Sequence, residues 1–296
     1  MNILLFGKNG QVGWELQRSL AVLGTVTALD FDSTEHCGDF GNPAGIADTV
    51  RALRPGVIVN AAAHTAVDKA EGEPGFARTL NATTPGVLAE EAARLSAWLV
   101  HYSTDYVFDG SGSRPWVETD APAPLSVYGA TKLEGERAIQ QSGCQHLILR
   151  TSWVYAARGG NFAKTMLRLA QERERLTVID DQWGAPTGAE LLADVTAHAL
   201  RHLRERPQDG GLYHCAASGE TTWHAYAKYV LARASQAQPA IEIKATEVAP
   251  IPTSAFPTPA RRPHNSRLDT TKLRTTFGLA LPPWQAGVAR MLTEIL

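Results

Sequence analysis

Apolar runs alternate with amphipathic stretches along the first half of the chain. The runs lie at 3–7, 26–30, 57–63, 98–104 and 147–155. Between them, apolar residues recur at helical spacing over 11–23, 45–53, 82–96 and 128–141. Most of the runs are too uniformly apolar to face water on either side, which is typical of parallel strands covered by helices. The pattern therefore predicts an α/β fold with a doubly wound, Rossmann-like parallel sheet.

The alternation becomes less regular after residue 155. The sequence predicts helices near 162–174, 188–204 and 222–235, strands at 176–180, 212–216 and 241–245, and two helices near the C-terminus. Prolines between 248 and 266 predict a loop without regular structure. We expect residues 1–155 to form a dinucleotide-binding domain. Residues 156–296 are expected to form a smaller, mainly substrate-binding α/β region, and segments of the two can interleave.

Composition and charge narrow the classes of function. The 296 residues are 44% apolar and 20% charged, with a formal net charge of −2. This balance is typical of a globular protein, and without a long basic run it argues against binding to nucleic acid or to an anionic membrane. No basic leader or long apolar segment is present, so we expect a cytoplasmic protein. The three cysteines lie far apart in no metal-ligand spacing and are expected to be reduced.

A glycine-rich turn joins the first predicted strand to the first predicted helix. Gly7, Gly10 and Gly13 in "GKNGQVG" stand where the chain must turn sharply and expose backbone amides. The helix that begins there has unpaired amides and a positive dipole end that favour phosphate, so Gln11 and Val12 would also border a dinucleotide. The alternative is an ordinary tight strand-to-helix turn. The position in the first βα unit favours the dinucleotide.

Residues at the ends of the second and third strands are placed to contact the rest of a dinucleotide. Asp30 ends the second strand, where a carboxylate accepts hydrogen bonds from ribose hydroxyls and repels a 2′-phosphate. It therefore favours NADH over NADPH, although a strand-end aspartate is also common as a turn residue. Asp39 and Phe40 are expected beside the adenine. His64, which follows the third strand, is expected on the nicotinamide side.

Tyr128 and Lys132 are the leading candidates for catalysis. An i, i+4 pair lies on one face of a helix, and an ammonium beside a phenol stabilises the phenolate and lowers the pKa of the tyrosine. Thr104 ends the fourth strand, where parallel sheets bind ligands, and its hydroxyl can hold a keto oxygen together with the tyrosine. The alternatives are an amphipathic surface helix, a threonine that reflects β-propensity and, for Asp105, a turn residue.

Several segments together resemble one family. They are "GKNGQVG", "NAAAHTAVDKAE", "HYSTDYVFDG", "VYGATKLEGE", "RTSWVY", "DQWGAPT" and "PTPARRPHNSRL". Spread over nearly the whole chain, they are similar to the dTDP-4-dehydrorhamnose reductases, which belong to the extended short-chain dehydrogenase/reductases. The resemblance implies a Rossmann domain, NADH or NADPH as cofactor and a nucleotide-sugar substrate.

The resemblance also implies roles for individual residues. Tyr128 would give a proton, with Lys132 and Thr104 completing the catalytic set. Hydride transfer to the 4-keto carbon of dTDP-4-dehydro-L-rhamnose would give dTDP-L-rhamnose, a precursor of cell-surface polysaccharide such as lipopolysaccharide. Ala63, Thr65, Tyr102, Tyr128 and Lys132 are expected to contact the cofactor with the residues named above. Contacts to the substrate are expected from Thr104, Asp105, Tyr106 and Trp153.

Two further groups of charged residues are candidates for binding. Arg261 and Arg262 in "PARRP" can neutralise a diphosphate bidentately, although a solvated or structural salt-bridge role is the alternative for at least one of them. The resemblance implies, for some members, a homodimer bridged by Mg²⁺ through surface glutamates. The matching positions here are Glu15, Glu190 and Glu294, for which the alternative is solvated helix carboxylates.

Two other functions share parts of this pattern. A nucleotide-sugar 4,6-dehydratase or 4-epimerase would keep the glycines, the tyrosine and the lysine. A dehydratase of this type, however, usually has an acid directly after the Thr-Asp pair, where this chain has Tyr106. A non-catalytic dinucleotide-binding regulatory subunit, such as the one associated with methionine adenosyltransferase, is disfavoured because Thr104, Tyr128 and Lys132 are all present. The sequence therefore favours a reductase.

Overall fold

The centre of the protein is a parallel sheet of six strands. The computed structural model describes residues 1–237 and 241–296. The strand order is β10-β5-β4-β3-β1-β2, and every neighbouring pair is parallel. These strands are β1 (Asn2–Phe6), β2 (Thr25–Leu29), β3 (Val57–Asn60), β4 (Trp98–Thr104), β5 (Gln145–Thr151) and β10 (Gly211–His214). The chain adds β2 on one side of β1 and β3 on the other, which creates a switch point where open α/β sheets bind ligands.

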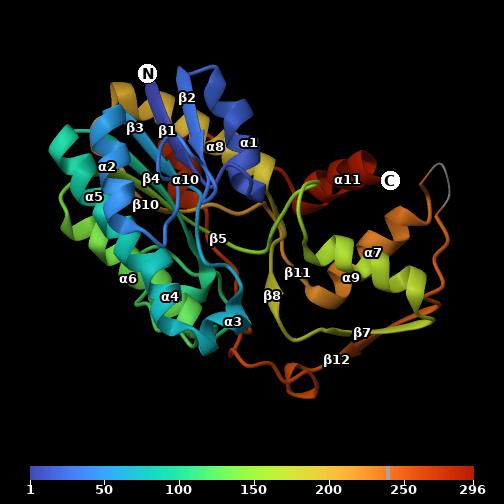
Figure 1. Ribbon diagram of the computed structural model, residues 1–296. Coiled ribbons are helices and arrows are strands. Elements are labelled where there is room, and N and C mark those ends of the chain that lie inside the picture. The colour runs from blue at the N-terminus through green and yellow to red at the C-terminus, as the bar shows by residue number, and fades with distance from the viewer. Residues whose placement is uncertain (238–240) are drawn as a thin grey trace.

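Helices cover both faces of this sheet (Figure 1). On one face lie α1 (Gln11–Ala21), α8 (Ala189–Glu205) and α10 (Thr271–Phe277). On the other lie α2 (Pro43–Leu53), α5 (Thr84–Leu95) and α6 (Val127–Gln141). Along β1, Ile3 and Leu5 pack toward the first set while Leu4 and Phe6 pack toward the second. Both faces of the sheet are therefore buried, and the predicted doubly wound α/β fold is confirmed.

A smaller unit of helices and short strands lies beside the sheet (Figure 1). It contains β6 (Val154–Tyr155), α7 (Phe162–Glu172), β7 (Arg175–Ile179), β8 (Trp183–Gly184), β9 (Thr187–Gly188), β11 (Thr221–Thr222), α9 (Trp223–Ala234), β12 (Glu247–Ile251) and α11 (Trp284–Ile295). Its own apolar core includes Met166, Tyr226 and Trp284. The chain crosses between the two units more than once, because α8 and β10 come from the later residues and pack in the sheet layer.

Short elements complete the chain. Between β3 and α5 lie α3 (Val67–Gly72), α4 (Pro74–Arg78) and a π-helical turn (Thr79–Thr83). Single 3₁₀ turns lie at Asp105–Val107, Pro207–Asp209 and Thr253–Ala255. Among residues 1–237 and 241–296, the structure contains no helix with the length and apolar character needed to cross a membrane.

The prediction of a strand at 241–245 is wrong. The predicted loop of residues 248–266 is wrong over residues 248–251, which belong to a strand, while residues 252–266 contain only a 3₁₀ turn and an isolated bridge. Ile241, Ile243 and Ala245 pack against the core of the smaller unit without pairing in a sheet, so their alternation reflects burial alone. The strand is β12, which pairs in parallel with β7. It contains Pro250, which an edge strand tolerates because one side of the strand needs no ladder hydrogen bonds.

Candidate active site

A cavity of about 770 Å³ opens at the carboxyl ends of the central strands. Its position at the switch point is where an open parallel sheet is expected to hold a ligand. The sequence-predicted residues that line it are Gly7, Gly10, Gln11, Val12, Asp30, Asp39, Phe40, Ala63, Thr65, Tyr102, Thr104, Asp105, Tyr106, Tyr128, Lys132 and Trp153. These residues surround one cavity, although some of them are separated by about half of the length of the chain.

The glycine turn fits a phosphate group for steric and electrostatic reasons. Gly7 has φ +83°, and a Cβ there would lie 2.8 Å from the backbone of Ala61. A Cβ on Gly13 would lie 1.9 Å from the carbonyl oxygen of Gly7, so Gly13 allows the helix to pack against the turn without lining the cavity itself. Gly10 is the N-cap of α1 and offers no side-chain acceptor to the first amides of the helix. Those amides are left for an anion.

Asp30 lines the cavity and also supports the glycine turn. Its Oδ2 accepts a hydrogen bond from the amide of Asn9 at 2.9 Å, and its Oδ1 accepts one from the amide of Phe31 at 2.8 Å. The carboxylate therefore ties the end of β2 to the turn after β1. Asp39 lies along the same part of the cavity and accepts from the amide of Gly41 at 2.8 Å. Both turn-residue and ligand-binding roles fit this geometry.

Tyr128 and Thr104 meet where α6 passes the end of β4. The ring of Tyr128 lies edge-on to Tyr106, with 5.6 Å between ring centroids. Burial raises the pKa of Tyr128 to about 12, with a hydrogen bond to the Thr104 side chain opposing the rise and the Asp105 carboxyl adding to it. The expected lowering of this pKa by Lys132 is wrong for this structure. The phenol is protonated at neutral pH.

Lys132 is buried behind the tyrosine and bonded to the sheet. Its Nζ donates a hydrogen bond to the carbonyl oxygen of Tyr102 at 2.6 Å and lies 3.2 Å from Nε2 of His101. Burial lowers the pKa of Lys132 to about 8. His101 in turn contacts Asn60. Neither His101 nor Asn60 was identified from the sequence. The histidine inside the apolar run "WLVHYST" is an available signal, because buried polar residues need a partner.

Three buried oxygen atoms along the cavity have no hydrogen-bond partner in the described part of the chain. They are Ser103 Oγ, Asp105 Oδ2 and Thr151 Oγ1. Asp105 is 2% exposed, and burial raises the pKa of its carboxyl to about 7 despite the neighbouring hydroxyls of Ser266 and Thr104. Buried polar atoms are normally bonded, so these atoms fit a polar ligand such as the hydroxyls of a sugar or a ribose.

Two tryptophans stack at the edge of the cavity that faces the smaller unit. Trp153 follows β5 with φ +49°, a backbone conformation that side chains with a Cβ rarely adopt. Its ring stacks on Trp223 at 3.5 Å between centroids. Trp223 begins α9 and was not identified from the sequence, and neither were the cavity-lining Phe31 and Phe76. The stacked pair provides an apolar face for a ligand.

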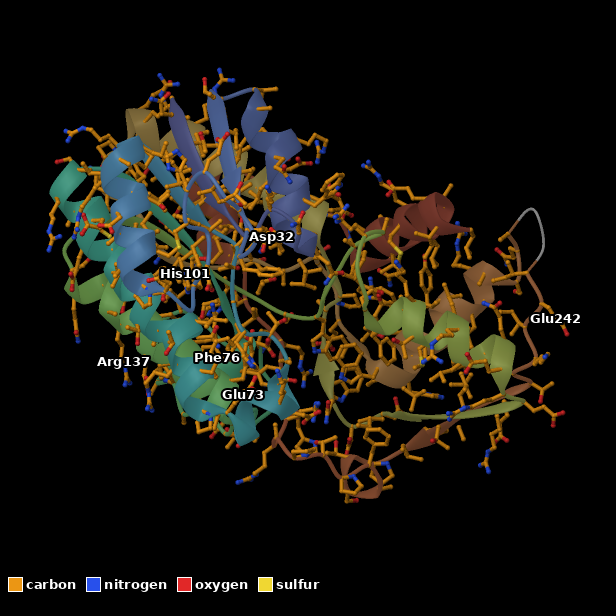
Figure 2. All side chains as sticks on the ribbon, viewed as in Figure 1. Asp32, Glu73, Phe76, His101, Arg137 and Glu242 are labelled. Atoms are coloured by element: carbon orange, nitrogen blue, oxygen red, sulfur yellow. The ribbon has the colours of Figure 1, made fainter. Side chains whose placement is uncertain are left out.

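The structure does not bring His64, Arg261 and Arg262 into the cavity lining. His64 is buried, with its Nε2 2.6 Å from a carboxylate oxygen of Glu73, the residue that Figure 2 labels near Phe76. Arg262 makes a bidentate ion pair with Asp68, at 2.7 and 3.1 Å. Arg261 is exposed. For Arg262 the geometry matches the salt-bridge alternative.

The predicted magnesium ligands do not form a site within one chain. No group of three or more His, Cys, Asp or Glu side chains among residues 1–237 and 241–296 is arranged to hold a metal ion. Glu15 lies 3.5 Å from Arg18, and Glu294 lies 3.2 Å from Arg290. Both carboxylates thus have cationic neighbours. At the third predicted ligand, Glu190, burial raises the pKa of the carboxyl.

The fold and the site define a class of protein. A glycine turn at the first helix, an acidic residue after the second strand and a Thr, a Tyr and a Lys that line one cavity at the strand ends are the features of a dinucleotide-dependent oxidoreductase of the short-chain type. The chain belongs to the RmlD substrate binding domain family, whose model matches residues 1–296. The resemblance seen in the sequence is therefore confirmed.

Comparisons with individual proteins agree with this family. A dTDP-4-dehydrorhamnose reductase of Shigella flexneri is 63% identical over 295 residues, covering 100% of this chain and 98% of the relative. The crystal structure of such a reductase from Clostridium acetobutylicum has a TM-score of 0.89 at 33% identity, covering 100% of this chain and 99% of the other. A reductase from Bacillus anthracis in complex with NADP has a TM-score of 0.87 at 32% identity, covering 99% of each chain.

Proposed function

We propose that the protein reduces the 4-keto group of dTDP-4-dehydro-L-rhamnose to give dTDP-L-rhamnose, with NADH or NADPH as the reductant. The observation that carries the proposal is the identity of 63% over the whole chain with a dTDP-4-dehydrorhamnose reductase. The meeting of Thr104, Tyr128 and Lys132 at one cavity supports the same reaction. The structure of the Bacillus anthracis reductase in complex with NADP supports a nicotinamide cofactor.

The residues of the site fit this chemistry. When bound, the reduced nicotinamide supplies a hydride to the carbonyl carbon of the substrate. Tyr128 is a neutral phenol with a pKa of about 12, so it holds the proton that the carbonyl oxygen must receive. Thr104 Oγ1 accepts a hydrogen bond from the amide of Tyr106 and donates one to Asp105, both at 3.1 Å, which fixes its direction at the end of β4. The glycine turn and Asp30 would hold the dinucleotide.

The dehydratase alternative lacks the acid that it needs after the Thr-Asp pair. Tyr106 occupies that position, and burial raises the pKa of its phenol further. Elimination and reduction also differ in their products. A reductase consumes one reduced nicotinamide for each sugar converted, whereas a dehydratase or an epimerase leaves the total amount of the cofactor in each redox state unchanged.

The decisive experiment is a direct assay with purified protein. We expect dTDP-4-dehydro-L-rhamnose to oxidise NADH or NADPH with a one-to-one yield of dTDP-L-rhamnose, measured by nicotinamide absorbance and by NMR of the sugar. Without cofactor oxidation, the proposal is refuted and a regulatory subunit is favoured. The carboxylate of Asp30 predicts that kcat/KM with NADH is at least equal to that with NADPH, and a strong preference for NADPH contradicts that role for Asp30.

The homodimer remains a prediction of the family resemblance, as does any bridging Mg²⁺. Sedimentation with and without a chelator tests both. A loss of the dimer on chelation would support bridging by the carboxylates of two chains. A monomer under both conditions would contradict the prediction.

A further inference from the structure

A line of buried polar side chains runs from β3 through β4 to α6, and its two ends, Asn60 and Lys132, line the cavity. Nδ2 of Asn60 lies 3.0 Å from Nδ1 of His101, and Nε2 of His101 lies 3.2 Å from Nζ of Lys132. All three residues are at most 2% exposed. Figure 2 shows His101 inside the layer built around the sheet. Buried groups of this kind must match donor to acceptor along the whole line.

The orientation of the Asn60 amide fixes the tautomer of His101. Oδ1 of Asn60 accepts a hydrogen bond from the amide of Ala62 at 3.0 Å. The NH₂ group of Asn60 therefore faces His101 and can only donate. Nδ1 of His101 must accept, so in the neutral imidazole the proton lies on Nε2. Burial is the largest cause that holds the pKa of His101 well below its usual value, which keeps the ring neutral.

The N–H at Nε2 of His101 points at Lys132, and this determines which form of the lysine fits. A neutral amine has a lone pair that accepts from Nε2–H, and it can still donate to the carbonyl oxygen of Tyr102 at 2.6 Å. An ammonium would place two donors against each other. Rotating the Asn60 amide would only move that conflict to the amide of Ala62.

The charges around Lys132 also favour the neutral form. No carboxylate in the described residues lies within ion-pair distance of its Nζ. The titratable groups beside it are Glu136 of α6 and His101 of β4, and Glu136 is paired with Arg150 of β5 at 2.6 Å. A buried amine without a counter-ion loses its proton easily.

We propose that Asn60 and His101 disfavour the ammonium form of Lys132 in the cofactor-free protein, and that dinucleotide binding above neutral pH is therefore coupled to the uptake of one proton from solvent at Lys132. This rests on the proposed function, because it assigns a cofactor-linked change to the same site. The bound dinucleotide brings negative phosphates and ribose hydroxyls that accept hydrogen bonds, which favour the ammonium. His101 and Asn60 are then positioning residues that act through Lys132.

The first test measures the tautomer of His101 in the wild-type protein without cofactor. In ¹⁵N-histidine NMR, Nε2 should show a protonated, pyrrole-like shift and Nδ1 an unprotonated, pyridine-like shift. The signal is assigned by its loss in His101→Gln, because the chain has nine histidines. A proton on Nδ1 would overturn the proposal. This measurement needs no substrate or cofactor, so its result is independent of the proposed function.

The second test measures proton uptake by calorimetry of NADH binding in two buffers with different enthalpies of ionisation. Uptake should rise from near zero at about pH 6 to nearly one proton at about pH 9, as expected when a free amine with a pKa of about 8 becomes a stable ammonium. A pH-independent uptake, or none at about pH 9, would overturn the proposal without any variant. If NADH does not bind at all, the proposed function fails and the tautomer measurement still decides the position of the proton.

A variant separates this mechanism from a general effect of binding. In Asn60→Asp, a carboxylate accepts from Nδ1–H, so His101 should change tautomer and Lys132 should be an ammonium before the cofactor arrives. Uptake at about pH 9 should fall by at least half. Asn42→Asp is the matched control, because Asn42 caps α2 without lining the cavity and aspartate is an equally good cap. Equal uptake in Asn60→Asp and the wild type would contradict the proposal.

Discussion

Replacing Asp105 by asparagine should stabilise the protein above neutral pH. The Asp105 carboxyl is 2% exposed, and one of its oxygens has no hydrogen-bond partner in the described residues. Burial raises its pKa from the ordinary value of 3.8 to about 7. Asparagine keeps nearly the same shape and an oxygen that can accept from the Thr104 hydroxyl, which bonds Oδ1 at 3.1 Å. The substitution therefore removes mainly the cost of burying a charge.

The size and pH range of the effect follow from the pKa. Between about pH 4 and pH 7 the folded protein holds a proton on Asp105 that the unfolded chain has released, so the free energy of unfolding falls as the pH rises. At 1.36 kcal/mol per pKa unit, a rise from 3.8 to about 7 corresponds to a full cost of about 4 kcal/mol above pH 7. Relaxation around the ionised group reduces this, so about 2–4 kcal/mol is expected at pH 8.

The assay is urea unfolding of wild type and Asp105→Asn across this pH range. The two proteins should be equally stable near pH 4, and the variant should gain with increasing pH until about pH 8. Asp109→Asn is the matched control, because the backbone amide of Ser111 bonds its carboxylate at 2.8 Å and lowers its pKa. The expected change in the free energy of unfolding has the opposite sign for this control. Asp109→Asn should therefore be less stable than the wild type above about pH 4. The reasoning would be refuted if Asp105→Asn and the wild type had the same free energy of unfolding at every pH, or if their difference did not change with pH.

Three other substitutions have expected outcomes. Tyr128→Phe should lower kcat by about 10²–10⁴-fold, because only the proton donor is removed. Its NADH affinity, measured by fluorescence titration, should change little. Near-normal turnover would place the acid elsewhere. Gly13→Ala puts a methyl group 1.9 Å from a backbone oxygen and should abolish NADH binding, whereas Gly72→Ala, with nothing within 4 Å, should bind normally. Glu136→Gln leaves Arg150 as a buried unpaired charge and should lower the free energy of unfolding in urea by about 3–5 kcal/mol. A decrease of less than about 1 kcal/mol would contradict the importance of this ion pair.

The local pattern of the sequence predicted the elements whose signal is periodic. The apolar runs of β1, β3, β4 and β5 are mostly buried on both faces, so each carries its own evidence for a covered parallel strand. The glycine turn was equally predictable, because only glycine satisfies the close approach at Gly7 and Gly13. The strand predicted at 241–245 was wrong because its apolar residues are buried by packing and do not pair in a sheet. Alternation of apolar and polar residues does not distinguish packing from pairing.

The candidate site was predicted where its residues follow strands directly and was missed where partners come from distant segments. Thr104 and Asp105 end β4, so their place in the cavity follows from the topology. Trp223 enters from α9, and nothing in its own neighbourhood indicates that it stacks on Trp153. Arg262 faces Asp68, which lies far away in the chain, so only the fold shows that its charge is already paired.

Local spacing and the positions of strand ends were enough to predict the α/β class, the glycine turn and the candidate residues Thr104, Tyr128 and Lys132. The tertiary structure decided the chemical state of those residues. Whether Lys132 is an ammonium beside a phenol or an amine bonded to the sheet depends on His101 and on the loss of water around both, and protonation follows from that environment. A pKa is a property of the folded surroundings, which residue identity and spacing do not contain.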